Sequence, residues 1–380
     1  MLVGVPKEVK DNEYRVGLLP AGVRELIHHG HKVLVEADAG LAIGFDNSSY
    51  EAIGAEIVAM PEEIFRRADL VVKVKEPQAV ERHQLHESQT LFTYLHLAPD
   101  LLQTQELLDS GATCIAYETV TDARGRLPLL APMSEVAGRM SIQAGAMCLE
   151  KSHGGSGILL GGVPGTHQGR VVILGGGVVG QNAAQMAVGL GASVTVIDKS
   201  LDVLRQLHAR FGNQVQTLYA TQDAIIEETL TADLVIGAVL VPGASAPRLV
   251  TREMVSQMKK GSVLVDVAID QGGCFETSKP TTHADPTYVV DGVVHYCVAN
   301  MPGAVARSSA AALNNATLPF VLQLADKGAE AAMKADPHLQ RGLNIYQGKV
   351  TNLQVSEAHG MGYSPFEKLL CQKVVHSSYD

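Results

Sequence analysis

The sequence predicts an α/β protein with two doubly wound parallel sheets. The chain of 380 residues is longer than one hydrophobic core usually supports, so two domains are expected. Short β-branched segments alternate with helical patterns twice along it, and the second series opens on a glycine-rich turn. With 46% hydrophobic and 18% charged residues, the chain can bury a large core and does not resemble a disordered protein.

The first series of elements fills the N-terminal third of the chain. Five β-branched segments predict strands at 2–5, 32–36, 69–75, 90–97 and 113–120. The helical patterns end on Gly30 and Gly111, since glycine readily takes the left-handed conformation that terminates a helix. Alternating strands and helices predict a parallel sheet covered on both faces.

The second series follows a connecting helix expected over 132–151, with Ser134 as its N-cap. Six segments predict strands at 170–174, 193–198, 216–219, 233–240, 262–269 and 293–299. From Met301 the pattern is helical and lacks strand signals, so this last part is expected to pack on the first domain. The predicted division is 1–130, 131–300 and 301–380.

Composition limits the partners and the compartment. A net charge of −10, no lysine-rich tract and 4% aromatic residues argue against nucleic acid. Five widely spaced cysteines without a CxxC pattern fit buried, reduced thiols in a cytoplasmic protein. The N-terminus shows no signal peptide. The uncharged stretch 171–197 contains six glycines, which fits a soluble core and no membrane span.

The segment 175–180, GGGVVG, fits the dinucleotide-binding fingerprint GxGxxG. It follows an apolar strand and precedes a helical pattern, so Gly175, Gly177 and Gly180 would allow a tight turn, close approach of a pyrophosphate, and close packing of helix on strand. The alternative is a glycine turn that serves packing only. Asp198 ends the next strand 18 residues after Gly180, where a carboxylate would bind ribose hydroxyls and repel a 2′-phosphate. NAD is therefore preferred to NADP, although Lys199 weakens the preference.

Polar residues at other predicted strand ends are candidates for catalysis, because ligands of open α/β sheets bind there. Asp270 follows one apolar strand, although an acid at this position is often a helix cap or turn residue. Asp266, four residues earlier and within that strand, could instead be a buried hydrogen-bonding group. His96 closes another strand and could exchange protons near neutral pH, or could be a structural histidine. Lys75 ends a third strand, where a lysine either reaches water or meets an anion.

Taken together, the chain resembles the NAD-dependent alanine dehydrogenase family. The likeness covers nearly the whole chain and is carried by VGVPKEVKDNEYRVGLLP, VVKVKEP, FTYLHLA, PMSEVAGRM, LLGGVPG, GGGVVG, DLVIGAVLVPG, VDVAIDQGG and VANMPGA, in matching order and spacing. The resemblance implies two Rossmann-like domains that face a cleft, with the nucleotide domain inserted in the catalytic domain. It also implies a homohexamer.

The resemblance further implies roles for single residues. Arg15 and Lys75 would bind the substrate carboxylate, although Arg15 taken alone reads as an ordinary solvated loop residue. His96 would activate water and protonate the leaving amine, and Asp270 would orient the water or His96. The residues implied to contact NAD are Ser134, Gly175, Gly177, Val178, Gly180, Asp198, Val239, Leu240, Val267, Ala268, Ile269, Asp270, Val298, Ala299, Asn300 and Met301.

Four positions depart from well-known relatives. Val203 and Ala220 replace a basic residue and a serine near the adenosine end, which puts NAD affinity in question. Gln323 and Lys327 stand where some relatives bind magnesium, so no metal site is expected.

The reaction that the resemblance implies is L-alanine + NAD⁺ + H₂O giving pyruvate, ammonium and NADH. The alternative of another class is a nucleotide-binding subunit like that of proton-translocating transhydrogenase, which binds NAD without turning over alanine. A second alternative is a related amino-acid or opine dehydrogenase, which would differ in the pocket around Tyr94, Met133 and Asn300.

Overall fold

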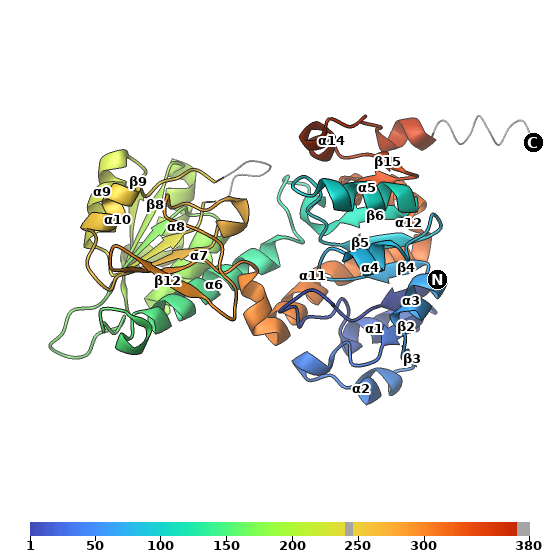
Figure 1. The fold of residues 1–380 in the computed structure, drawn as a ribbon, viewed down its shortest axis with the longest axis horizontal. Helices are drawn as coiled ribbons and strands as arrows, with labels where there is room; N and C mark the ends of the chain where they lie inside the picture. Colours follow the sequence, from blue (N-terminus) through green and yellow to red (C-terminus); the bar gives the residue numbers. More distant parts are fainter. Residues whose placement is uncertain (240–245, 371–380) are drawn as a thin grey trace, which may run out of the picture. The chain divides into compact units, whose positions relative to one another are not determined.

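The computed structural model describes residues 1–239 and 246–370. The chain divides into two units, one made of Met1–Pro132 with the chain from Val305 on, the other of Met133–Ala304. Figure 1 shows the blue and cyan segments together with the orange-red C-terminal part in the first unit, and the green, yellow and light-orange segments, β12 included, in the second.

The first unit contains an eight-stranded sheet in the order β15-β14-β6-β5-β4-β1-β2-β3. The strands are β1 (Leu2–Val5), β2 (Lys32–Glu36), β3 (Glu56–Val58), β4 (Leu70–Val72), β5 (Thr90–Thr93), β6 (Thr113–Ala116), β14 (Leu343–Tyr346) and β15 (Lys349–Val350). The helices are α1 (Pro20–His28), α2 (Asn47–Glu51), α3 (Pro61–Arg67), α4 (Ala79–Arg82), α5 (Leu101–Ser110), α11 (Ala306–Lys327), α12 (Ala329–Ala335), α13 (Pro337–Gln340) and α14 (Leu353–His359). Strands β1 to β6 run parallel, as alternating strands and helices predict.

The second unit contains a seven-stranded sheet in the order β12-β13-β11-β10-β7-β8-β9. The strands are β7 (Arg170–Leu174), β8 (Ser193–Asp198), β9 (Val215–Tyr219), β10 (Leu234–Gly237), β11 (Val263–Asp266), β12 (Thr287–Val290) and β13 (Val293–Tyr296). The helices are α6 (Ala131–Cys148), which enters from the first unit, α7 (Val178–Gly189), α8 (Leu201–Phe211), α9 (Gln222–Thr231) and α10 (Arg252–Gln257). The edge strand β12 pairs antiparallel with β13, and the other neighbouring strands are paired parallel.

The first five strands of each sheet have the same order. In each sheet, the first strand lies beside the second on one side and beside the fourth on the other. The direction in which successive strands are added to the sheet therefore reverses between β1 and β4, and between β7 and β10. Such a switch point leaves a crevice at the carboxyl ends of the strands, where open α/β proteins bind ligands. The loops after β1 and β4, and those after β7 and β10, therefore occupy the expected ligand positions.

The sequence predicted that the last part of the chain is helical. The structure corrects this prediction, because this part also contains two strands. Strand β14 pairs antiparallel with β6, and β15 pairs antiparallel with β14. A two-residue turn joins them, in which Gln347 and Gly348 have φ of 51° and 67°, values that match a tight hairpin turn. Strand β14 is only four residues long and pairs with the distant strand β6, so the local sequence gives little sign of it.

Several predicted strands end earlier than the sequence indicated. Strand β4 ends at Val72, β5 at Thr93 and β11 at Asp266, so Lys75, His96 and Asp270 all lie in the loops that follow. The helix expected from 132 begins at Ala131 and contains Ser134 in its first turn, so Ser134 is not an N-cap. Cys114, Cys148, Cys274 and Cys297 are free and buried, as predicted; Cys371 lies outside the described residues.

Candidate active site

The three glycines of the fingerprint have different local geometries. Gly175 has φ of +100°, so it makes the tight turn after β7 in a conformation that other residues rarely adopt. A Cβ on Gly180 would lie 1.9 Å from the carbonyl oxygen of Gly175, so only glycine lets α7 pack this closely on the strand. Gly177, the N-cap of α7, has no heavy atom within 4 Å of the position a Cβ would take.

This open space lies at the N-terminus of α7, where unpaired backbone N–H groups and the helix dipole favour an anion. A side chain at Gly177 would extend into this open space. The loop is therefore shaped for a dinucleotide, and the geometry argues against a glycine turn that serves packing alone.

Asp198, at the end of β8, lies beside the glycine loop. Its Oδ2 accepts a hydrogen bond from the N–H of Gly176 at 2.7 Å, and its Oδ1 accepts one from the N–H of Ser200 at 2.8 Å. The carboxylate is half-buried. The structure therefore brings together the acid and the glycine loop that the sequence paired.

Val203 lies against the same loop. A Cβ on Gly176 would come within 2.7 Å of its Cγ1, so an apolar side chain packs on the turn. Ala220, directly after β9, packs against the hydrophobic core of the second unit.

The other predicted cofactor contacts lie after strands of the second sheet. Val239 follows β10, the segment 267–270 follows β11, and the segment 298–301 follows β13, all at the carboxyl ends of parallel strands. Val178 is the first residue of α7 and is 43% exposed. Leu240 lies outside the described residues.

Asp266 and Asp270 have different surroundings. Asp266 is fully buried and accepts hydrogen bonds from the N–H groups of Ala268 and Cys274 and from the hydroxyl of Ser278. Burial raises its pKa, and these hydrogen bonds act in the opposite direction. Asp270 lies in the 3₁₀ turn Ile269–Gln271 and is exposed. Asp266 is thus the structural acid, as predicted, whereas Asp270 is accessible to a ligand.

Arg15 is buried, which corrects the prediction of a solvated loop residue. Only 2% of it is exposed, and its Nε and Nη2 donate to the two carboxylate oxygens of Glu13 at 2.6 and 2.5 Å. Burial alone would lower the pKa of Arg15, but the hydrogen bonds and charge of Glu13 outweigh it and raise the pKa. The loop that carries Arg15 lies close to the end of β4, since a Cβ on Gly17 would come within 2.4 Å of the carbonyl oxygen of Val72.

His96 is held in an uncommon backbone conformation, with φ of +50°. Glu118 accepts a hydrogen bond from the N–H of His96 at 2.6 Å, and its Oε1 lies 3.8 Å from the imidazole Nδ1. The ring stacks on Tyr94, with 5.8 Å between centroids and 4° between planes. The imidazole is thereby oriented from two sides, while 46% of the side chain stays exposed.

Lys75 is half-buried in the loop after β4. Arg15, Lys75 and His96 therefore all lie beyond the carboxyl ends of β1, β4 and β5, which are neighbouring strands of one sheet. Two cations and an imidazole at one sheet edge can bind a carboxylate and exchange protons beside it. The sequence analysis did not identify the acids that bind these residues: Glu8 binds Lys75, Glu13 binds Arg15 and Glu118 binds His96. Only the pair Glu13 and Arg15 could have been suspected, because the two residues are close in sequence.

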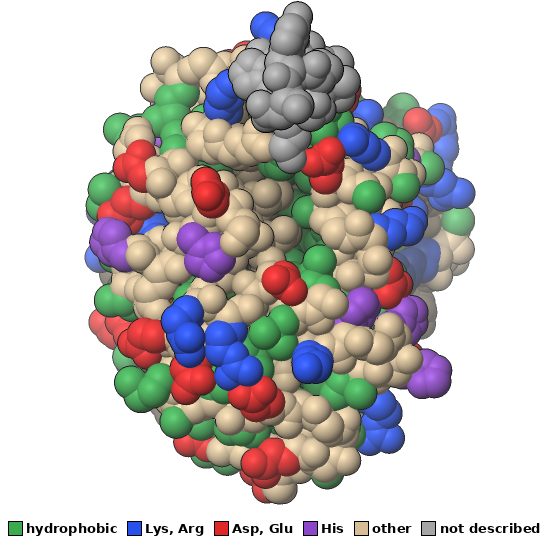
Figure 2. All heavy atoms as spheres, turned by 90° about the vertical axis from the view of Figure 1, so that its right-hand side faces the viewer, with side chains coloured by type: hydrophobic (Ala, Val, Ile, Leu, Met, Phe, Trp, Pro, Cys, Tyr) green, Lys and Arg blue, Asp and Glu red, His purple; other side chains and the backbone are tan. Residues whose placement is uncertain are grey.

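The surface that Figure 2 shows carries basic and acidic side chains interspersed. None of the helices that the structure describes has the length and apolar character needed to cross a bilayer. Within residues 1–239 and 246–370, no three His, Cys, Asp or Glu side chains form a group suited to a metal ion. Gln323 donates instead to the carbonyl of Ala332 at 3.4 Å.

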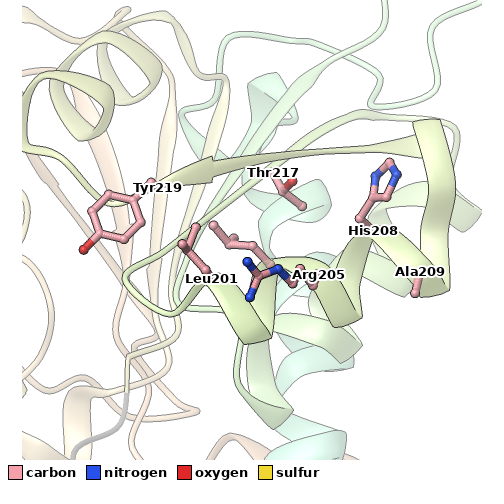
Figure 3. A pocket seen from close by; sticks show the side chains of 7 residues that line it. Leu201, Arg205, His208, Ala209, Thr217 and Tyr219 are labelled. Carbon is pink, nitrogen blue, oxygen red and sulfur yellow. The ribbon is translucent and has the colours of Figure 1, made fainter.

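A pocket of about 430 Å³ lies between α8 and the edge strand β9 (Figure 3). Leu201, Arg205 and His208 line it from the helix, and Thr217 and Tyr219 line it from the strand. The guanidinium of Arg205 is paired with Asp202 at 2.8 Å. The pocket contains none of the predicted site residues.

Comparison with known proteins matches both units to one family. Residues 4–137 match the N-terminal domain model of alanine dehydrogenase/PNT, and residues 141–353 match the C-terminal domain model. The chain belongs to the alanine dehydrogenase family. The resemblance seen in the sequence and the predicted fold class are thereby confirmed, as is the enzyme class, an amino-acid dehydrogenase that works with a nicotinamide cofactor.

Individual relatives are similar over nearly the full chain. The alanine dehydrogenase of Halomonas elongata is 61% identical over 96% of this chain and 98% of its own, and that of Bacillus subtilis is 57% identical over 97% and 98%. A solved L-alanine dehydrogenase superposes with a TM-score of 0.92 at 50% identity, covering 95% of this chain and 99% of its own. A transhydrogenase from Sinorhizobium meliloti reaches 0.79 at 25% identity, covering 93% and 99%. The transhydrogenase is therefore the more distant relative.

Proposed function

We propose that this chain oxidises L-alanine to pyruvate and ammonium with NAD⁺, in a cytoplasmic homohexamer. The observation that carries the proposal is the placement of Arg15, Lys75 and His96 at the carboxyl ends of adjacent strands in a member of this family. Residues 1–130 and 301–380 would form the catalytic domain, and residues 131–300 the NAD domain.

The second unit fits NAD. Gly177 leaves room at the helix N-terminus for the pyrophosphate, and Asp198 would accept hydrogen bonds from the ribose hydroxyls. A 2′-phosphate would face this carboxylate, which favours NAD over NADP. The segments after β10, β11 and β13 would contact the rest of the cofactor. When bound, NAD⁺ supplies the acceptor for the α-hydrogen of alanine, which leaves as a hydride.

Arg15 and Lys75 would bind the alanine carboxylate. The guanidinium of Arg15 is rigid because Glu13 holds two of its nitrogens, so binding costs it little freedom. Fixing the carboxylate also fixes the α-carbon, and orientation of this kind lowers the barrier by removing the entropy cost of bringing reactants together.

His96 would move the protons. Loss of the hydride from the neutral amine leaves a cationic iminium at the α-carbon, and water must add to this carbon before ammonium departs. The imidazole would take a proton from this water and later deliver one to the leaving amine, as a general base and then a general acid. Glu118 accepts the backbone N–H of His96 and Tyr94 stacks on the imidazole, which supports a defined position for this group. The charge of Asp270 would stabilise the cationic iminium.

The test is NADH absorbance on mixing the protein with NAD⁺ and L-alanine at alkaline pH, with D-alanine, L-serine and L-lysine in parallel. We expect strong turnover with L-alanine and at most weak turnover with L-serine, since small changes in an apolar pocket shift binding by only ~1–3 kcal/mol. The His96→Ala variant should bind NADH normally and lose most turnover. If none of the amino acids led to NADH formation while NADH still bound, the proposal would be overturned and a transhydrogenase-like role favoured.

A further inference from the structure

Three buried charges lie beneath the loop that carries Lys75. Lys73, the first residue after β4, is fully buried, and Glu8 and Glu81 are 7% and 4% exposed. The ammonium of Lys73 donates to Glu8 Oε2 at 3.2 Å and to Glu81 Oε1 at 2.7 Å. One cation thus joins two carboxylates that come from different elements, the loop after β1 and the helix α4.

Glu8 also binds the backbone on which Lys75 sits. Its Oε1 accepts the N–H of Val74 at 2.7 Å, and its Oε2 accepts the N–H of Lys75 at 3.3 Å. Its two oxygens therefore link the loop after β1 to the loop after β4, across the switch point of the first sheet. A side chain that holds two successive N–H groups fixes the direction in which the intervening backbone leaves the strand.

Glu81 differs from Glu8 in the backbone N–H groups that it binds. It shares the ammonium of Lys73, but its other oxygen accepts the N–H of Gln78 at 2.7 Å, three residues beyond Lys75. Both acids are buried and both are paired with the same cation. Only Glu8 is bonded to the backbone N–H of Lys75.

Stability alone is a weak explanation for such a cluster. Burial raises the pKa of Glu8, and the charge of Lys73 only partly counters it. Buried ion pairs of this kind often contribute no more stability than apolar side chains of the same volume would. The cluster fixes the backbone path of residues 73–75, because Glu8 binds two of its N–H groups. Apolar side chains could not do this.

We infer that Glu8 is a positioning residue for Lys75, and that it sets the affinity of the enzyme for its amino-acid substrate. The inference rests on the proposed function, in which Lys75 binds the substrate carboxylate. Glu8 acts through the backbone: it holds the Lys75 main chain, and the ammonium of Lys75 is thereby directed toward the substrate. The cofactor, which the second unit binds, does not depend on this contact.

The test compares Glu8→Gln with Glu81→Gln, which removes the other carboxylate of the same cluster. In Glu8→Gln we expect KM for L-alanine and for pyruvate to rise on the order of 10- to 100-fold, since small misplacements of binding groups have effects of this size. The NADH dissociation constant should stay within about twofold of wild type. Glu81→Gln should lower the melting temperature comparably and change KM less than about threefold. Glu8→Asp keeps the charge but shortens the side chain by one methylene, so its KM should lie between those of the wild type and Glu8→Gln. This variant replaces Glu8→Gln in the comparison if Glu8→Gln does not fold.

Amide hydrogen exchange resolved to single residues supplies a readout that does not depend on activity. The amides of Val74 and Lys75 should exchange faster in Glu8→Gln and at the wild-type rate in Glu81→Gln. Equal rises of KM in both variants, or an unchanged KM in Glu8→Gln with normal turnover in the wild type, would overturn this inference alone. A wild-type protein that does not oxidise alanine would instead overturn the proposed function, and with it the substrate role of Lys75.

Discussion

The carboxylate of Asp198 accepts a hydrogen bond from the backbone N–H of Gly176, with 2.7 Å between Oδ2 and the nitrogen. One side chain therefore holds the glycine loop and presents a charged oxygen where the ribose of NAD would bind. Since the second strand of a dinucleotide fold ends beside the first, β8 delivers its last residue directly to the turn that follows β7.

This relationship predicts a large effect of Asp198→Ala on cofactor affinity. Hydrogen bonds to charged groups contribute about 1.5–3 kcal/mol, so NADH should bind on the order of 10- to 150-fold more weakly. Asp202→Ala, which removes an exposed acid from α8, is the control and should bind NADH as the wild type does. Fluorescence titration of NADH measures both. An unchanged affinity in Asp198→Ala would rule out its role at the ribose.

The glycine loop predicts opposite results for two alanine substitutions. Gly177→Ala should fold with wild-type stability, because its Cβ would meet no atom within 4 Å, yet it should weaken NADH binding by occupying the pyrophosphate position. Gly180→Ala should lose about 3 kcal/mol or more of stability, because its Cβ would lie 1.9 Å from a carbonyl oxygen. Urea unfolding and NADH titration separate the two. Normal NADH affinity in Gly177→Ala would argue against the pyrophosphate placement.

Because Asp266 is buried and Asp270 is exposed, substitution of Asp266 should lower stability, whereas substitution of Asp270 should lower turnover. Asp266→Asn should lose about 2–3 kcal/mol, since an amide cannot accept all the hydrogen bonds that the buried carboxylate accepts. Asp270→Asn should unfold as the wild type does, because this side chain is exposed, and should lose turnover. Thermal unfolding and NADH formation are measured for both. Similar losses of stability in the two variants would contradict these assignments.

The buried cysteines predict low thiol reactivity that persists to alkaline pH. Burial raises the pKa of Cys114 and Cys274 to about 12, and of Cys148 and Cys297 to about 11. Since the thiolate is the reactive form and these pKa values are raised, the four thiols should stay protonated at pH 8–9 and resist alkylation. Mass spectrometry after iodoacetamide treatment should find them modified only in guanidinium. Rapid labelling of any of the four in the folded protein would show that its site opens.

The sequence predicted the nucleotide-binding half most closely because its signals are local. The strand 170–174, the turn at Gly175 and the strand 193–198 agree with β7 and β8 to the residue, since β-branched runs and a glycine with positive φ determine them without help from distant residues. Asp198 could be placed because its spacing from the glycines reflects one strand–helix–strand unit.

The first unit depends on contacts between distant segments, and the prediction was poorer there. The segment 90–97 reads as one strand, but Glu118 binds the N–H of His96 and turns the chain away from the sheet. Arg15 reads as exposed because its polar loop gives no sign of the crevice that buries it. Strands β3, β12, β14 and β15 went unpredicted, since each is short and owes its pairing to a neighbour.

The central claim is that the α-hydrogen of L-alanine passes to NAD⁺ as a hydride. It is tested most directly by incubating the enzyme with NAD⁺ and L-alanine that carries deuterium on the α-carbon, in ordinary water, and analysing the NADH by mass spectrometry. We predict one deuterium on the nicotinamide ring of each NADH formed, with an equal amount of pyruvate. NADH without deuterium, or no NADH at all, would contradict the account.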